Sequence, residues 1–364
     1  MDVRTKIVFA CVLVSLFSSA MVGLFAWHAS SNLLLETSER QLDALAEARA
    51  EDFGAIADAW GEAVGLIRSR TELREQLAII GDERDRAVST IRRILQDARE
   101  SADIVSRIAV FDAAGTLVAF SGEAALPPDA GQPTDEDLTF SRFLRRRDDG
   151  YDARTLMPLK LGGDIVGTLE VVIDVREILQ LAENTRGLGT TGETMLVAQL
   201  EPSTVTVLND LRNSSQSPVE LPLDALSQPV TAALAGESRV FRGVDDYRGV
   251  PVWAATRYLP RSKTGIVVKI DEGEALEPVL ALRRQFVDVA LSVGALAILA
   301  GALLGLLLSK KIRALDAVVK RVRNGETALR ADTAGEDELS FLAESFNELL
   351  DKTYANDAEP RNRR

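Results

Sequence analysis

The stretch "SRIAVFDAAGTLVAFSG", Ser106–Gly122, changes the period of this sequence from helical to alternating. Apolar residues recur at every second position on both sides of "DAAG", whose aspartate and glycine favour a turn. The stretch "LMPLKLGGDIVGTLEVVIDV", Leu156–Val175, repeats this design around "GGD". Two hairpins of this kind predict an antiparallel sheet.

The segment between the two hairpins reads differently. "PTDEDLTFSRFLRRR", Pro133–Arg147, begins with acidic capping candidates and is predicted to form a short helix. A hairpin, a helical crossing and a second hairpin suit an antiparallel sheet with helices on one side.

A similar set of elements follows along the chain. "TMLVAQ" and "STVTVLN" are typical of strands, Leu223–Gly236 of a helix, "SRVFRGVDDYRGVPVWAATRYLP" of a hairpin, and "TGIVVKID" of a last strand. The sequence therefore predicts two α/β modules in series, a distal one over about 75–190 and a proximal one over about 190–272.

Helices are expected on both sides of these modules. Apolar residues recur every three, four or eight positions over residues 30–76, which predicts one long helix without a proline. A second helix is expected at Arg86–Ser101. A third is expected to begin at Glu272 and to lead out of the proximal module.

Two uncharged apolar runs, Ile7–Trp27 and Val289–Leu308, are each long enough to cross a membrane as a helix. The first run also fits a cleavable signal peptide, with Arg4 and Lys6 as its basic flank. Its length and its continuation into helical periodicity favour an uncleaved anchor. The fold class predicted is a membrane α+β protein with two transmembrane helices.

Basic residues flank both runs on one side. Arg4 and Lys6 precede the first run, and Lys310, Lys311 and Arg313 follow the second. Short flanks rich in Lys and Arg remain in the cytoplasm. We therefore expect a two-pass protein of the bacterial inner membrane, with both termini cytoplasmic and the modules periplasmic or extracellular.

The expected layout assigns every residue to a part of the chain. Residues 1–6 are the cytoplasmic N-terminus, 7–28 and 286–308 the transmembrane helices, 29–285 the exported domain, 309–355 a cytoplasmic helical domain and 356–364 a disordered tail.

Composition excludes some classes of function. The net charge is −13, and most of it falls in the exported part, which argues against nucleic acid as a partner. Cys11, the single cysteine, lies inside the first apolar run, so no disulfide holds the exported part. His28, the single histidine, is expected to be an interfacial residue. We find no catalytic constellation, no metal-ligand spacing and no cofactor motif.

Two short heptad patterns follow the second apolar run. Each has a narrow apolar seam spaced 3-4-3, so two helices from one chain cannot bury their seams, whereas four helices from two chains can. "NG" at Asn324–Gly325 ends the first helix. The predicted core residues are Ile312, Leu315, Val319, Val322, Leu339, Leu342, Phe346 and Leu349.

The exported part resembles the double Cache family, the PAS-like extracytoplasmic sensors of bacterial receptors. The resemblance rests on "GLGTTGETMLV" at Gly187–Val197, on "DYRGVPVWAATRYLP" about 50 residues later, and on the exit "GIVVKIDEGEA". It covers roughly residues 30–285. It implies that a small ligand, such as an amino acid, an organic acid or an amine, binds in the distal module.

The same resemblance points to an arginine with nearby aromatic residues in the distal module. "FSRFLRRRDDGY" supplies Phe140, Arg142, Phe143 and Tyr151. A planar guanidinium at Arg142 could clamp a carboxylate. The alternative is that Arg142 and 145–147 form one solvated helix face that balances two aspartates.

The cytoplasmic helices resemble a HAMP domain, the relay between a membrane span and an output module. The resemblance rests on Gly325–Glu326, on "EDEL" at 336–339 and on "SFNELL" at 345–350. Ala314 stands in place of the usual proline. Thr327 and Ala331 stand where large apolar residues are usual.

These features predict a homodimeric receptor without enzyme activity. It would sense a small extracytoplasmic ligand and act through HAMP helices on a separate cytoplasmic partner. The alternative is a truncated or split input half of a histidine kinase, a diguanylate cyclase or a methyl-accepting chemoreceptor.

Overall fold

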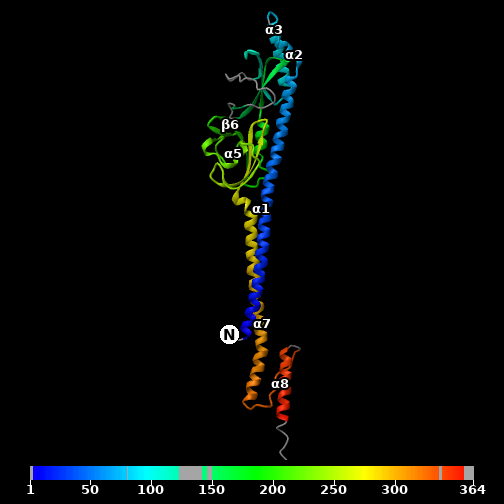
Figure 1. The fold of residues 1–364 in the computed structure, drawn as a ribbon, viewed down its shortest axis with the longest axis vertical. Coiled ribbons are helices and arrows are strands. Elements are labelled where there is room, and N and C mark those ends of the chain that lie inside the picture. The colour runs from blue at the N-terminus through cyan, green and yellow to red at the C-terminus, as the bar shows by residue number, and fades with distance from the viewer. Residues whose placement is uncertain (1–2, 80, 123–141, 146–149, 336–337, 356–364) are drawn as a thin grey trace, which may run out of the picture. The chain divides into compact units, whose positions relative to one another are not determined.

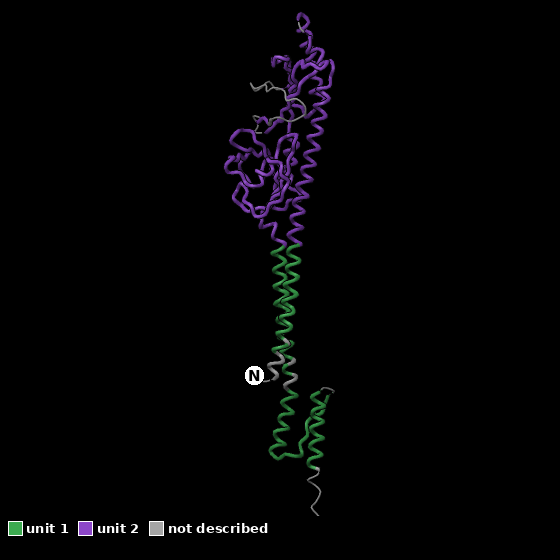
Figure 2. Tube along the Cα trace, viewed as in Figure 1, with its two compact units in different colours: residues 1–32, 279–364 green, residues 33–278 purple. Residues whose placement is uncertain are grey.

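The computed structural model describes residues 3–79, 81–122, 142–145, 150–335 and 338–355. They form two compact units, one of residues 33–278 and one that combines residues 1–32 with residues 279–364 (Figure 2). The predicted site residue Phe140 and the predicted disordered tail lie outside the described residues.

Helix α1, Val3–Arg68, is 66 residues long and passes alongside both modules within the larger unit (Figure 1). Its buried face repeats every three, four or seven residues, as a helix packed on one side requires. The buried apolar residues on this face are Leu42, Ala46, Phe53, Ala57, Trp60, Val64 and Ile67. Helices α2, Thr71–Leu77, and α3, Arg84–Glu100, follow.

The distal module is one antiparallel sheet with the strand order β2-β1-β5-β4-β3. The β1–β2 turn is stabilised by Asp112, whose Oδ1 accepts hydrogen bonds from the backbone N of Ala114 and of Thr116 at 3.0 and 2.9 Å. Gly162 and Gly163, with φ of 64° and 102°, allow the tight β4–β5 turn. The strands are β1 Val105–Asp112, β2 Leu117–Gly122, β3 Arg142–Arg145, β4 Tyr151–Leu161 and β5 Asp164–Asp174.

The proximal module repeats this connectivity after helix α4, Arg176–Glu183. Its sheet has the order β8-β7-β6-β11-β10-β9, so the first and last strands again pair at the centre and β8 is an added edge strand. Helix α5, Gln228–Leu234, packs on β10 and β11. The strands are β6 Glu193–Glu201, β7 Thr204–Val207, β8 Val219–Pro222, β9 Val240–Asp245, β10 Pro251–Leu259 and β11 Thr264–Asp271.

One hydrophobic core is shared by α1 and by one face of each sheet. It joins Phe53 and Trp60 of α1 to Ile108 and Val171 of the distal sheet and to Ile266 of the proximal sheet. A second, smaller core lies on the opposite face of the proximal sheet and includes Val230 of α5. The proximal sheet is therefore packed on both faces, and α1 covers one face of each module.

Polar contacts fix α1 lengthwise against the proximal module. The Arg257 guanidinium of β10 lies 2.8 Å from Asp43 Oδ1 and 2.6 Å from Glu47 Oε2, one turn apart on α1. Arg49 Nη2 of α1 donates a hydrogen bond of 2.7 Å to the backbone O of Asn184. Hydrophobic packing alone is not directional, so these contacts define the position of the helix.

Two described helices are long and apolar enough to cross a membrane, and they are Val12–Arg68 and Glu277–Leu303. The second belongs to α7, Glu277–Arg323, which follows the short α6, Glu272–Ala275. Trp27 and Phe286 pack edge to face with ring centroids 6.1 Å apart. Helix α8, Glu338–Ala355, ends the described chain.

The predicted fold class is confirmed: antiparallel sheets in two modules lie between two apolar helices. The predicted hairpins form at the expected turns, and the long helix ends at Arg68 rather than continuing to residue 76. One prediction is wrong, because residues 142–145 form strand β3 instead of continuing a helix. Pairing with β4 along the sheet edge outweighs the local helix preference here. The domain boundaries remain predictions.

The shared core can be tested on α1. Phe53→Ala should lower the free energy of unfolding by about 3–5 kcal/mol, because Phe53 is fully buried and the cavity left behind cannot close completely. The measurement is denaturant unfolding of the full chain in detergent, followed by tryptophan fluorescence.

Leu66→Ala on the same helix is the matched control, because this side chain is 72% exposed. It should change the free energy of unfolding by no more than about 0.5 kcal/mol. Equal effects of the two substitutions would contradict a core that depends on the buried face of α1.

Candidate ligand-binding site

Three arginines lie at one level across the distal sheet. Arg107 of β1 is in register with Val172 of β5, Val172 with Arg154 of β4, and Arg154 with Arg142 of β3. Residues in register across neighbouring antiparallel strands share a face of the sheet. We call these positions, together with Glu170, the arginine row.

Glu170 lies between the two arginines at the centre of this row. Its carboxylate is fully buried, with Oε1 at 2.5 Å from Arg154 Nε and at 3.2 Å from Arg107 Nη2. Both arginines are also buried, since Arg107 is 7% exposed and Arg154 is 3% exposed. A buried carboxylate needs such partners because its own desolvation is costly. Arg107 and Arg154 make further interactions beyond this trio.

The second carboxylate oxygen of Glu170 has a different environment. Glu170 Oε2 is buried and accepts no hydrogen bond from any residue that the structure describes. A buried acceptor in this state has a free-energy cost that a donor from a ligand would remove. Guanidinium groups of the row suit a ligand carboxylate, and Glu170 Oε2 suits a ligand ammonium. The charges of the row therefore match the carboxylate and the ammonium of an amino-acid-like molecule.

The structure separates the predicted site residues. Arg142 occupies its place in the arginine row, as the register partner of Arg154. Phe143 is half-buried and packs against the core shared with α1, and Tyr151, only 3% exposed, is part of that core. The two aromatic residues thus belong to the hydrophobic core.

Sequence reasoning missed Arg107, Arg154 and Glu170. The available signal was a charged residue inside each of three apolar strands, in "SRIAVF", "DARTLMPL" and "GTLEVVI". A charge that replaces an apolar residue within a buried strand needs a partner on a neighbouring strand. Without strand pairing, that partner could not be identified.

The proximal module buries charges that satisfy one another. Lys269 Nζ, 2% exposed, lies 2.7 Å from Glu193 Oε1 and is paired with Asp246. Tyr247 donates its hydroxyl to Glu193 Oε1 at 3.0 Å, and the backbone N of Asn213 donates to Glu193 Oε2 at 3.1 Å. This cluster joins β6, β11 and the β9–β10 turn, so its role is structural.

The ionisation of this cluster follows from its pairing. Burial alone would raise the pKa of the Asp246 carboxyl, but Lys269 and Arg248 lower it below its ordinary value. Burial and the neighbouring Glu193 carboxylate raise the pKa of the Tyr247 hydroxyl. Asp246 therefore remains a carboxylate and Tyr247 a neutral donor at physiological pH. Among the residues described, no group of three or more His, Cys, Asp or Glu side chains could hold a metal ion.

A single carboxylate connects the loop between the modules to α6. Glu274 accepts hydrogen bonds from Thr190 N at 2.7 Å, from Thr191 N at 2.8 Å and from Thr191 Oγ1 at 2.5 Å. The loop belongs to the "GLGTTG" segment, where Gly189 has a φ of 66°. A Cβ at Gly189 would lie 2.2 Å from Glu274 Oε1, so a larger residue here would displace the Glu274 carboxylate from its hydrogen bonds. We call this contact the Glu274 latch.

The hydrogen bonds of the latch also change the pKa of the Glu274 carboxyl. Burial alone would raise its pKa, but the hydrogen bonds from Thr191 and Thr190 lower it to about 2. Helix α7 begins three residues later, at Glu277. The latch therefore connects the junction of the two modules to the start of the second apolar helix.

Side-chain hydrogen bonds attach α8 to the segment that follows α7. The side-chain amide of Asn347 accepts a hydrogen bond from Ala331 N at 2.8 Å and donates one to Ala331 O at 2.9 Å. Gly325, with a φ of 104°, ends α7 as predicted. Val322, Ala331, Ala343 and Leu350 are buried within the single chain.

Much of the predicted seam remains uncovered in one chain. Four of its eight residues have exposed fractions between 39% and 61%, and these are Ile312, Val319, Leu342 and Leu349. Leu315, Leu339 and Phe346 are half-buried, and only Val322 is buried. Their joint role as a core remains a prediction.

Comparison with known proteins identifies the C-terminal helices. Residues 303–354 match the HAMP domain. Together with the two-module fold between two apolar helices, this match confirms the predicted organisation of a sensor followed by a HAMP domain. The chain is therefore a membrane protein of signal transduction. No curated protein matches the sequence.

Solved structures similar to this chain include two sensor domains. The ligand-binding domain of the Campylobacter jejuni chemoreceptor Tlp3, in complex with L-norvaline, is 13% identical with a TM-score of 0.45, over 67% of this chain and 95% of that one. The ligand-binding domain of the Pseudomonas aeruginosa PAO1 amino acid chemoreceptor PctC, in complex with GABA, is 15% identical with a TM-score of 0.43, over 64% and 99%. TM-scores below 0.5 do not establish a common fold.

The Glu274 latch gives a pH-dependent prediction. A carboxyl whose pKa is lowered by folding stabilises the folded state above its unfolded pKa, here 4.5, and loses this contribution as the pH falls toward 2. Glu274→Gln should therefore lower the free energy of unfolding at pH 7 by about 1–2 kcal/mol, a value reduced by partial exposure. The difference should shrink between pH 4.5 and pH 2.

The measurement is denaturant unfolding of the full chain in detergent between pH 7 and pH 2.5. Glu277→Gln removes the same charge from the exposed start of α7 and should have little effect at any pH. A cost of Glu274→Gln that is the same at both ends of this range would show that its charge does not stabilise the latch.

Proposed function

We propose that this protein is a homodimeric receptor of the bacterial inner membrane that senses a small amino-acid-like ligand outside the membrane. The ligand binds in the distal module, with its carboxylate on the arginine row and its ammonium on Glu170. A cytoplasmic signalling partner receives the signal from the HAMP domain. The observation that carries this proposal is a buried carboxylate between two arginines, with one oxygen that accepts no hydrogen bond from a described residue.

The two modules differ in how their buried charges are paired, and this difference supports a ligand site in the distal module. In the proximal module, Lys269 pairs with two carboxylates and Glu193 accepts hydrogen bonds at both oxygens. The proximal sheet also has a hydrophobic core on each face. Among its described residues, the proximal module therefore has neither a buried carboxylate oxygen without a hydrogen bond nor an uncovered sheet face, and it serves to connect the distal module to α7.

The proposed topology and the proposed dimer are both inferred from the residues that follow the second apolar run. The basic residues Lys310, Lys311 and Arg313 favour a cytoplasmic position for the HAMP domain. The exposed seam residues of one chain are apolar and would be covered by the same residues of a second chain in a parallel four-helix bundle. Ligand binding would then shift the balance between two packings of this bundle.

The ligand class is tested by screening the full chain in detergent against amino acids, organic acids and amines by thermal shift. Compounds with both a carboxylate and a free amine should raise the unfolding temperature. Arg142→Gln should weaken their binding tenfold to a hundredfold, because a charge-assisted hydrogen bond contributes about 1.5–3 kcal/mol. Calorimetric titration gives the dissociation constants.

Arg145→Gln is the matched control. It removes the same charge from the same short strand, but Arg145 is in register with Tyr151 rather than with Arg154 and so lies outside the row. Its ligand affinity should remain unchanged. Equal losses in both variants, or binding limited to amines without a carboxylate, would contradict a carboxylate site on the arginine row.

The dimer is tested by disulfide cross-linking in membranes. In a Cys11→Ser background, Leu315→Cys should form a disulfide between two chains, because seam positions of a parallel bundle approach to within about 7 Å. Asp316→Cys, one residue away on the same helix, should cross-link much less. Equal yields at both positions would show that the helices are not held by this seam.

A further inference from the structure

The face of the distal sheet that carries Glu170 continues into apolar residues. Glu170 of β5 is in register with Ala109 of β1 and with Leu156 of β4. Ala109 is in turn in register with Phe120 of β2. Residues in register across neighbouring strands share a face of the sheet, so these apolar side chains lie on the same face as Glu170. We call Phe120, Ala109 and Leu156 the first uncharged row.

A second uncharged row follows, further from the arginines. Thr168 of β5 is in register with Phe111 of β1 and with Pro158 of β4. Residues two positions apart along a strand share a face and lie about 6.5–7 Å apart. This face of the sheet therefore changes from charged to uncharged within one such step beyond Arg107 and Arg154.

The uncharged rows form a surface of their own. Ala109 is fully buried and Phe111 is 6% exposed, yet neither belongs to the two hydrophobic cores that the described residues form. Their neighbours on β1, Ile108 and Val110, do belong to the core shared with α1. Because successive side chains of a strand alternate between faces, the uncharged rows lie on the face opposite to that core.

We propose that the uncharged rows bind the side chain of the ligand, and that the ligand is an amino acid with an apolar side chain. This inference rests on the proposed function, in which the arginine row takes the ligand carboxylate and Glu170 takes its ammonium. Both groups of an α-amino acid are attached to the carbon that carries the side chain. The side chain therefore extends from the charged groups over a neighbouring row.

The direction of the side chain follows from the position of Glu170. Glu170 lies on the side of the arginine row that continues into the uncharged rows. On the opposite side, Asp152 of β4 is in register with Asp174 of β5. Two carboxylates are an unfavourable surface for an apolar group, because such a group removes water from them. An apolar side chain therefore fits only on the uncharged rows.

The same rows disfavour a charged side chain on the ligand. Apart from Glu170, the described residues at these two levels of the sheet are uncharged. A charge placed there would lose water without gaining a partner, whereas an apolar group gains free energy on leaving water. Ala109 adds little bulk beside Glu170, and Phe120, which is 38% exposed, offers an aromatic surface at the end of the first row.

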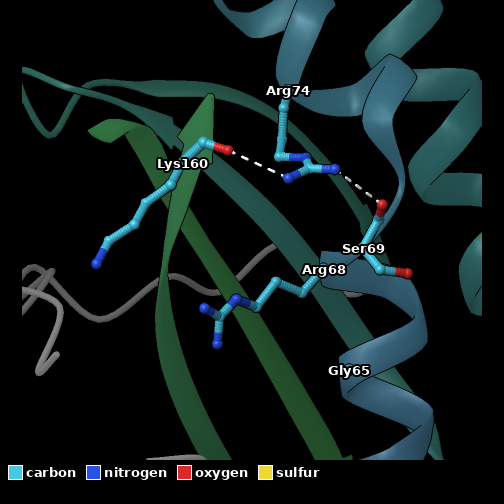
Figure 3. A pocket seen from close by; sticks show the side chains of 5 residues that line it. All are labelled: Gly65, Arg68, Ser69, Arg74 and Lys160. Atoms are coloured by element: carbon cyan, nitrogen blue, oxygen red, sulfur yellow. Dashed lines mark hydrogen bonds between the residues drawn. The ribbon is translucent and has the colours of Figure 1, made fainter. Parts of the chain in front are cut away.

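The strands that carry the rows are held in place before a ligand binds. Arg74 Nη1 of α2 donates a hydrogen bond of 3.2 Å to the backbone O of Lys160, near the end of β4 (Figure 3). Asp112 closes the turn after β1 by accepting hydrogen bonds from the backbone. A surface that is already ordered loses less conformational entropy on binding.

The test measures the affinity of the full chain in detergent for five amino acids by calorimetry. The probes are L-alanine, L-leucine, L-phenylalanine, L-aspartate and L-lysine. L-leucine or L-phenylalanine should bind at least tenfold more tightly than L-aspartate and L-lysine. Phe120→Ala should reduce the preference for that apolar amino acid over L-alanine at least fivefold, because the methyl group of L-alanine is too short to gain much from the ring.

Ile165→Ala is the matched control. It removes an apolar side chain that is 49% exposed from β5, in register with Lys160 and so beyond both rows. It should leave the preference unchanged. Binding of L-aspartate or L-lysine as tight as that of the apolar amino acids, or equal losses of preference in the two variants, would overturn this inference and leave the proposed amino-acid site intact. Absence of binding by all five would overturn the proposed function, and this inference with it.

Discussion

The exported part of this protein depends on one helix face that two modules share. Neither the distal nor the proximal sheet completes its core without α1, since Phe53 and Trp60 join residues of both sheets in one cluster. A shared core couples the modules, because a shift of α1 relative to one sheet changes its packing on the other. Close-packed interiors respond to such shifts by changing between discrete arrangements. The ion pairs of Arg257 with Asp43 and Glu47 restrict which arrangements are available.

The two modules have the same connectivity but treat buried charge differently. The proximal module surrounds Lys269 with carboxylates, and this cluster stabilises the β9–β10 turn against β6 and β11. The distal module places two arginines around one carboxylate and leaves an oxygen of Glu170 without a hydrogen bond from a described residue. Breaking a balanced cluster exposes unpaired charges, whereas an open acceptor gains from a new donor. The proximal arrangement therefore favours rigidity, and the distal one fits the ligand site proposed above.

Periodicity in the sequence was sufficient to predict the long helices, the hairpins and the two-module order. The turn residues at Asp112 and at Gly162–Gly163 form the predicted turns, because their conformations are local. The short strand β3 was predicted as a helix, since its stability comes from pairing with β4, and pairing is not local. The arginine row was missed for the same reason. Arg107 and Glu170 are separated by 63 residues, and only the register of β1 with β5 brings them together.

In the proposed mechanism, the signal reaches the HAMP domain through α6 and α7 without a chemical step. The Glu274 latch holds α6 to the loop between the modules by three hydrogen bonds. A movement of that loop therefore displaces α6 and the start of α7. Helix α7 continues without interruption from Glu277 to Arg323, and a continuous helix resists compression along its axis. The exposed apolar seam near its end is sensitive to such a movement, because a small rotation changes which side chains a partner helix covers. A binding energy of a few kcal/mol is sufficient for this mechanism, provided that the two packings of the bundle differ by no more than that.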